Sequence, residues 1–130
     1  MQLDKYQQMA TRTATYTDEI KGLLVNLEQS HPEECAVLSK LLRLNYVASG
    51  LAGEAGEFAN KIKKLLRDHS GYLGENEARE LSRELGDVLW YTSQAAREIG
   101  RTLDEIANEN LEILADRQSR GVIQGSGDDR

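Results

Sequence analysis

The stretch LAGEAGEFANKIKKLLR, residues 51–67, decides the fold, because its apolar residues recur at helical spacing. At 100° per residue they fall within an arc of about 100°, as expected for a helix that buries one face. A second stretch, residues 76–99, has the same periodicity, and Gly100 is placed to end it. In this second helix the side chains expected to face inward are Leu81, Leu85, Val88, Leu89, Thr92, Ala96 and Ile99.

Upstream of this pair, residues 4–16 are predicted to form a short helix, and residues 19–27 a less regular one. Ser30-His31-Pro32-Glu33 has the S-x-x-E pattern of a capping box, which predicts a helix from His31 towards Leu44. Three glycines then predict either a break or a close approach of backbones before the next helix is established. They are Gly50, Gly53 and Gly56.

Downstream, Thr102-Leu103-Asp104-Glu105 is a second capping box, and it predicts a helix that ends near Ser119. No stretch alternates as a strand would, so the predicted fold class is all-α, a helical bundle. We expect residues 1–120 to form a single helical domain and residues 121–130 to form a polar, glycine-rich tail.

Bulk composition narrows the function classes. The chain has 130 residues, which fits one domain, and a net charge of −6, which argues against binding a nucleic-acid polymer. The only cysteine is Cys35, so the chain can form no internal disulfide and no cysteine-rich zinc site. We find no signal peptide and no apolar run of membrane-spanning length, and we therefore expect a cytoplasmic protein without a membrane partner.

Two acidic pairs have matching positions on the two long helices. Glu54 and Glu57 are three residues apart, so they project from one side of their helix, on a flank of its apolar stripe. Glu84 and Asp87 repeat this spacing and this offset on the second helix. If the helices pack antiparallel through their apolar stripes, the four carboxylates converge over a shared cleft.

Carboxylates that converge repel one another unless a cation offsets their charge. Mg²⁺ suits such a site, because it prefers carboxylate oxygens and keeps places for water and phosphate oxygens. It would neutralise bound phosphates and lower the pKa of an attacking water. The alternative reading is that both acidic pairs are solvated helix flanks.

Two stretches resemble the MazG-like nucleotide pyrophosphohydrolases. They are GLAGEAGEFANKIKKLLRD, residues 50–68, and RELGDVLWYTSQAAREIG, residues 83–100. They carry that family's metal motif, E-x-x-E, a spacer and E-x-x-D. Residues 103–130 are similar to the small single-domain, often phage-associated branch.

The resemblance implies an all-α fold with an active site between helices that a second subunit completes. It also implies Mg²⁺, with Mn²⁺ as a substitute, and hydrolysis of a (d)NTP between the α and β phosphates to the monophosphate and pyrophosphate. Residue by residue, it assigns metal binding and catalysis to Glu54, Glu57, Glu84 and Asp87.

Other residues are candidates to bind substrate. Lys61 and Lys64 follow Glu57 on the same flank, where they can contact phosphates or simply pair with Glu57 and Asn60. Asn110 is expected inside an apolar stripe, bonded either to substrate or to a neighbouring helix. Further candidates are Tyr91 on the acidic flank, and Arg117 and Arg120, with Gly125-Ser126-Gly127 closing over the phosphates.

Two further residues bear on the substrate and on assembly. Many relatives carry a lysine where this chain has Ile113, so the bond that is cleaved stays open. Trp90 is expected opposite the apolar stripe of its helix, which predicts a subunit interface or a platform for base stacking.

The sequence thus predicts a homodimeric enzyme, or a dimer-of-dimers tetramer, that acts on (d)NTPs in nucleotide-pool sanitation or tailoring, in a bacterial or phage-infected host cytosol. One alternative is a (d)NTP/(d)NDP phosphohydrolase that releases orthophosphate stepwise. An alternative of another class is a non-catalytic helical dimerisation module.

Overall fold

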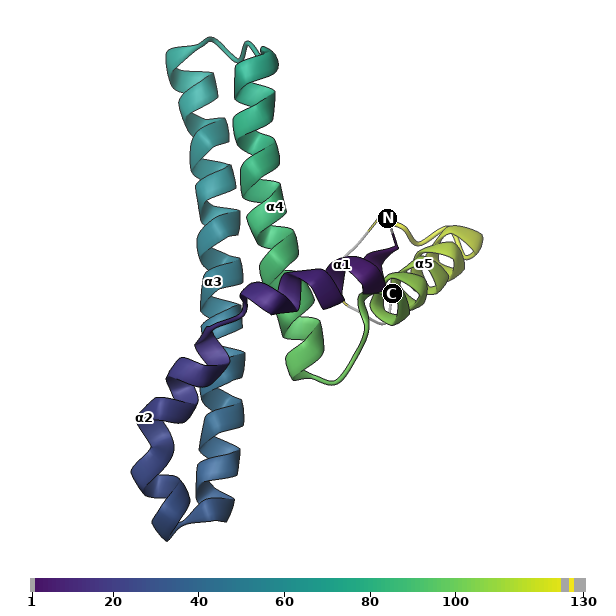
Figure 1. Cartoon of the computed structure of the whole chain (residues 1–130). Coiled ribbons are helices and arrows are strands. Elements are labelled where there is room, and N and C mark those ends of the chain that lie inside the picture. The colour runs from purple at the N-terminus through teal and green to yellow at the C-terminus, as the bar shows by residue number, and fades with distance from the viewer. Residues whose placement is uncertain (1, 125–126, 128–130) are drawn as a thin grey trace.

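A computed structural model describes residues 2–124 and residue 127, and within these residues all regular structure is helical. The described residues form five α-helices and one turn of 3₁₀ helix (Figure 1). In chain order they are α1 (Leu3–Ala10), the 3₁₀ turn η1 (Thr11–Thr13), α2 (Tyr16–Ser30), α3 (Pro32–Asp68), α4 (Glu75–Glu98) and α5 (Leu103–Ser119). The all-α prediction is therefore confirmed.

Helix α3 is the central element of the molecule, because α2 packs along its first half and α4 along its second half (Figure 1). Of the two alternatives predicted for the three glycines, the break is wrong, since α3 runs unbroken from Pro32 to Asp68, whereas a close approach of the helices is found at Gly50. A glycine inside a helix costs only about 1 kcal/mol relative to alanine, and packing on both sides of the position outweighs that cost. At Gly50 the glycine has a clear purpose: a Cβ there would overlap the ring of Tyr91 on α4.

The N-terminal third differs most from the prediction. The first helix ends at Ala10, and the turn at Thr11–Thr13 redirects the chain into α2, which is longer than predicted. The capping box at Ser30 is also wrong. Ser30 is the last residue of α2, where its hydroxyl donates to the carbonyl oxygen of Asn26 at 3.2 Å. A hydroxyl held in this way does not cap the next helix, and α3 begins at Pro32 with no side-chain cap.

At the other end of the chain the prediction succeeds. Helix α4 spans Glu75–Glu98 against the predicted 76–99, and α5 ends at Ser119 as expected. The second capping box is confirmed: the Glu105 N–H donates to Thr102 Oγ1 at 3.2 Å, and the Thr102 N–H donates to Glu105 Oε2 at 2.9 Å.

The core of a single chain is small and lies where α2, α3 and α4 meet. Tyr16, Ile20 and Val47 are buried there, and Trp90 packs against them with its ring edge-on to Tyr16 at a centroid distance of 6.5 Å. The exposure of Trp90, on which the prediction of a subunit interface or a base-stacking platform was based, is therefore wrong, because the side chain is half-buried against its own chain. The aromatic ring closes the core between α2 and α4.

Helix α4 is rotated about its axis relative to the prediction. Of the residues expected to face inward, Ala96 is buried, but Leu85 and Ile99 are 51% and 58% exposed. Glu84 is buried instead, with an exposed fraction of 8%. The interface between α3 and α4 thus contains charged side chains, such as Glu84 and Lys61, beside half-buried apolar ones, such as Phe58, Ile62, Leu81 and Val88.

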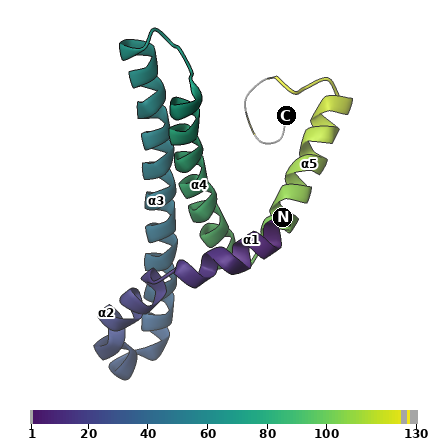
Figure 2. The same ribbon diagram turned by 45° about the horizontal axis from the view of Figure 1, so that its top comes forward.

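Helix α5 projects from this bundle. It leaves the end of α4 at an angle, so that α4 and α5 form the two arms of a V, and α1 crosses at the vertex (Figure 2). Contacts of α5 are with α1 and the end of α4. Among the described residues, no helix has the length and apolar character needed to span a membrane.

Candidate metal centre

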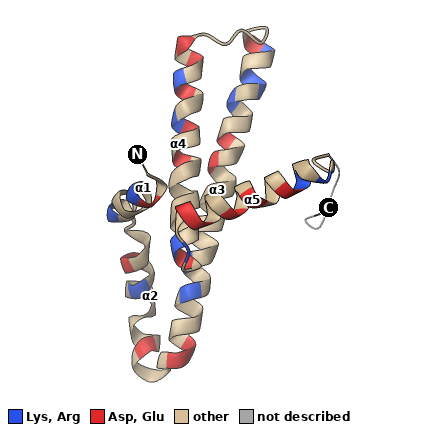
Figure 3. Ribbon diagram, turned by 90° about the vertical axis from the view of Figure 1, so that its right-hand side faces the viewer, with Lys and Arg blue, Asp and Glu red and all other residues tan. Residues whose placement is uncertain are grey.

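Three carboxylates from α3 and α4 converge. One oxygen from each of Glu54, Glu84 and Asp87 lies within 4.8 Å of the others. Glu54 is half-buried, Glu84 is buried and Asp87 is exposed. The group therefore has one face in the helix interface and one face open to solvent, which is the arrangement needed to hold an ion and admit a ligand. Figure 3 shows acidic residues on both helices of this hairpin, interspersed with basic ones.

Local geometry explains the convergence. Glu84 and Asp87 are three residues apart, so they project from the same side of α4, and that side faces α3. Gly50 lies one turn before Glu54 on α3 and makes room for the ring of Tyr91. Because the two helices approach closely at this point, the carboxylates beside it are brought within reach of one cation.

The electrostatics of the group favour a cation. The pKa of Glu54 is raised, first by burial and then by the negative charges of Asp87, Glu57 and Glu84. A divalent ion would remove this repulsion, and oxygen-only ligands suit Mg²⁺. The residues present therefore fit the metal that the sequence predicted.

Glu57 is the one member of the predicted set that lies outside the converging group. Its side chain is exposed, although its charge acts on Glu54. The structure thus brings together three of the four predicted ligands, and Glu57 is near them without sharing their centre.

Lys61 contacts the acidic group directly. Its ammonium lies 2.9 Å from Glu84 Oε1 and 3.7 Å from Glu80 Oε2, and the hydrogen bond to Glu84 raises the pKa of the lysine. The expected pairing with Glu57 is replaced by a contact between helices. A cation that binds Glu84 would compete with Lys61, and the released ammonium would be available to phosphate. Lys64 is exposed beside it, in a hollow of about 270 Å³ that also includes Glu77.

A second hollow of about 400 Å³ opens next to the carboxylates. It is lined by Glu54 and Asp87, by Trp90 and Tyr91, and by Thr13. The indole N–H of Trp90 donates to Thr13 Oγ1 at 2.8 Å, and the rings of Trp90 and Tyr91 lie edge-on at 4.8 Å. The predicted substrate residue Tyr91 is therefore adjacent to the acidic group.

Sequence reasoning missed two residues at this site. Thr13 reaches it only because η1 turns the chain there, and no periodic signal marks that turn. Tyr6 on α1 is close enough for the charge of Asp87 to raise its pKa, after the larger effect of burial. Both come from the N-terminal segment, whose path the sequence did not indicate.

The predicted substrate residues of α5 lie apart from the carboxylates within one chain, because α5 extends away from the α3–α4 hairpin (Figures 1 and 2). Asn110 is exposed rather than buried in an apolar stripe, so the expectation of its burial is wrong. Arg117 is half-buried, and Arg120 pairs with Asp116 at 2.7 Å. The predicted closing loop includes Gly125 and Ser126, which lie outside the described residues.

Comparison with known proteins identifies a family. A profile of the MazG nucleotide pyrophosphohydrolase domain matches residues 44–121, a segment that contains all the converging carboxylates. The chain is 41% identical over 135 residues to the Gene 37 protein of Mycobacterium phage L5, with 100% of both chains covered. No solved structure matches the chain.

Proposed function

The chain belongs to the MazG nucleotide pyrophosphohydrolase family, and from that premise we propose that it converts a (d)NTP to the (d)NMP and pyrophosphate in a reaction that depends on Mg²⁺. The observation that carries this proposal is the convergence of Glu54, Glu84 and Asp87, whose oxygens lie within 4.8 Å of one another. Lys61, whose ammonium lies 2.9 Å from Glu84, offsets part of the repulsion among these carboxylates, and a divalent ion would offset it more fully.

The proposed metal ligands are these three residues and Glu57, which lies beside them. When bound, the ion supplies charge neutralisation at the phosphates. The carboxylates would hold and orient the attacking water, and one of them would accept its proton. The partly exposed position of the group leaves room for the triphosphate.

The proposed substrate contacts surround the carboxylates. Lys61 would exchange Glu84 for a phosphate oxygen, and the nearby Lys64 would add a second positive charge. Tyr91 lines the hollow next to Glu54 and Asp87, where the nucleoside end of the substrate would lie. Asn110, Arg117 and Arg120 are proposed contacts that α5 brings from a second copy of the chain.

We also propose that the chain is a homo-oligomer, either a dimer or a dimer of dimers. Exposed apolar side chains support this, since α4 presents Leu85 and Leu89 to solvent and α5 presents Leu111 and Leu114, with exposed fractions from 37% to 62%. A monomer rarely exposes apolar patches of this kind. The biological setting that we propose is nucleotide-pool sanitation or tailoring in bacterial or phage-infected host cytosol.

Product analysis tests the reaction. The purified protein is incubated with a panel of ribo- and deoxyribonucleoside triphosphates with Mg²⁺, with Mn²⁺, or with a chelator, and the products are resolved by ion-exchange chromatography. We expect monophosphate and pyrophosphate in equal amounts with either metal, and no product with the chelator.

Each other outcome contradicts a defined part of the proposal. Orthophosphate with a transient diphosphate would contradict cleavage between the α and β phosphates. Turnover in the chelator would contradict the metal requirement. A lack of monophosphate from every nucleotide would contradict the enzymatic function and favour a non-catalytic dimerisation module.

A further inference from the structure

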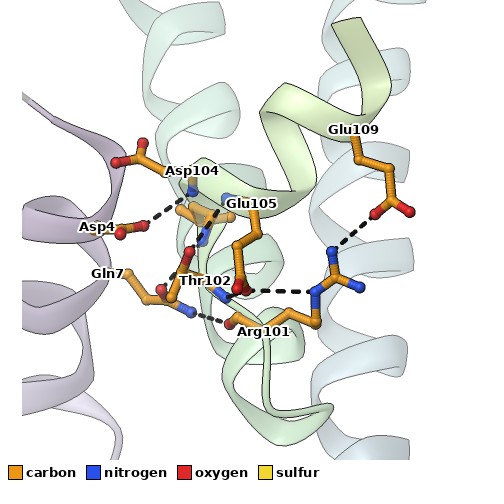
Figure 4. A network of polar contacts seen from close by, with 8 residues as sticks. Asp4, Gln7, Arg101, Thr102, Asp104, Glu105 and Glu109 are labelled. Carbon is orange, nitrogen blue, oxygen red and sulfur yellow. Dashed lines mark hydrogen bonds and ion pairs between the residues drawn. The ribbon is translucent and has the colours of Figure 1, made fainter. Parts of the chain in front are cut away.

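The first turn of α5 is capped by side chains that come from the other end of the chain (Figure 4). The Leu103 N–H donates to Gln7 Oε1 at 3.2 Å, and the Asp104 N–H donates to Asp4 Oδ1 at 2.9 Å. The next N–H, that of Glu105, is capped locally by Thr102. A helix normally leaves its first N–H groups without partners, so α1 supplies what the sequence near α5 lacks.

The Gln7 side chain connects three parts of the chain to α1: α4, the loop after it, and α5. Its amide nitrogen donates to the carbonyl oxygens of Ser93 on α4 and Arg101 in the loop, both at 3.1 Å, while its oxygen accepts from Leu103 on α5. The side chain is 9% exposed. A buried amide whose donors and acceptor are all used fixes the relative orientation of the groups it binds, because any other orientation leaves a buried polar group without a partner.

Apolar packing of α5 is confined to its first two turns, where Ile106 and Ala107 are half-buried. Leu103 is its one buried residue, at 4% exposure, whereas Leu111 and Leu114 are 62% and 43% exposed. Beyond the first turn the helix projects as an arm of the V (Figure 2). The angle between α4 and α5 is therefore set at the joint with α1, and the joint is mainly polar.

We propose that Gln7, assisted by Asp4, is a positioning residue that sets the direction of α5 relative to α4. This inference rests on the proposed function in one respect: through α5, Gln7 places Asn110 and Arg117 for contact with the substrate. Helix α1 thereby holds α4 and α5 in a fixed relative orientation. The N-terminal segment then contributes to substrate binding although it lies outside residues 44–121, which match the family profile.

The structural test measures the direction of α5 without using activity. Spin labels are attached at Arg79 on α4 and Glu112 on α5, both exposed, in a Cys35→Ser background, and labelled protein is diluted tenfold with unlabelled protein so that distances within one chain dominate. We expect Gln7→Met to broaden the distance distribution and to accelerate amide exchange at Leu103 by roughly tenfold. The control is Gln8→Met, at the exposed neighbouring position, which should change neither measurement.

A second variant covers the case in which Gln7→Met does not fold, as judged by far-ultraviolet circular dichroism. Asp4→Ala removes only the bond to the Asp104 N–H, so it should broaden the same distribution by a smaller amount. If neither variant moves or broadens the distribution relative to Gln8→Met, the positioning role is wrong.

Kinetics separate this inference from the proposed function. Because Gln7 acts through substrate contacts, we expect Gln7→Met to raise KM for the nucleotide roughly tenfold and to leave kcat within about twofold. A fall in kcat at constant KM would contradict positioning through α5. If the wild-type chain has no turnover at all, the proposed function fails, and the distance distribution alone still decides the role of Gln7.

Discussion

The two sides of α4 contrast sharply. The side that faces α3 carries Glu84, Asp87 and Tyr91, which are polar or ionisable, whereas the opposite side carries Leu85 and Leu89, which are partly exposed. The usual arrangement of an amphipathic helix is the reverse. The difference teaches that part of the apolar stripe of α4 is left outside the core of its own chain, and that the face of α4 towards α3 presents carboxylates of the proposed ion site.

The largest effect is expected on the polar side. Glu84→Gln keeps the size of the side chain but removes a negative ligand and the partner of Lys61, so kcat should fall by at least about 100-fold with helical content unchanged. Glu80→Gln is the matched control, since Glu80 also faces Lys61 but lies outside the converging group. Steady-state kinetics and circular dichroism check both, and equal activity of the two variants would remove Glu84 from the site.

The next effect is expected on the apolar side. Leu89→Asp places a charge in the stripe of α4, so if the stripe binds a second copy, the dissociation constant of the oligomer should rise by roughly 100-fold or more. Arg79→Asp, at an exposed position of the same helix outside the stripe, should leave assembly unchanged. Light scattering over a dilution series measures this. An oligomer that survives Leu89→Asp would show that another surface holds it together.

A smaller effect separates two glycines of α3. Gly50→Ala forces a Cβ into the ring of Tyr91 and should destabilise the fold by about 1–3 kcal/mol. Gly53→Ala meets nothing within 4 Å, so alanine's higher helix propensity should stabilise the fold by about 0.5–1 kcal/mol. Urea unfolding compares them. Equal and stabilising effects would mean that α3 and α4 do not approach closely at Gly50.

The smallest effect concerns the bond that ties η1 to α4. Thr13→Val removes the acceptor of the Trp90 N–H and should cost about 0.5–1.5 kcal/mol in the free energy of unfolding. In the background of Trp90→Phe the same change should cost almost nothing, because the donor is already gone. Urea midpoints of the four proteins test the coupling. If the two substitutions lower the free energy of unfolding additively, Thr13 and Trp90 do not form the hydrogen bond.

The sequence predicted the parts of the molecule that depend on local signals. The ends of α4 and α5 follow from Gly100 and from the capping box at Thr102, and the convergence of Glu54, Glu84 and Asp87 follows from matching three-residue spacings. The convergence of the carboxylates was predicted correctly although α4 is rotated relative to the prediction. A modest rotation of this helix keeps the flank beside its apolar stripe at the interface with α3.

The features that were missed depend on contacts between distant segments. The rotation of α4 brings the ring of Tyr91 against Gly50, a contact that apolar periodicity does not indicate. Trp90 was predicted to be exposed because it lies opposite the apolar stripe of α4, whereas its ring packs on Tyr16. Ser30 satisfies the capping pattern and yet belongs to the preceding helix, because α2 continues through it.

The most direct test of the central claim is a calorimetric titration of Mn²⁺ into the nucleotide-free protein, with Glu84→Gln and Glu80→Gln titrated in parallel. If the group formed by Glu54, Glu84 and Asp87 is a cation site, the wild type and Glu80→Gln should bind Mn²⁺ in a saturable manner, while Glu84→Gln should bind it at least about tenfold more weakly. Equal binding by all three proteins, or no binding by the wild type, would contradict the claim.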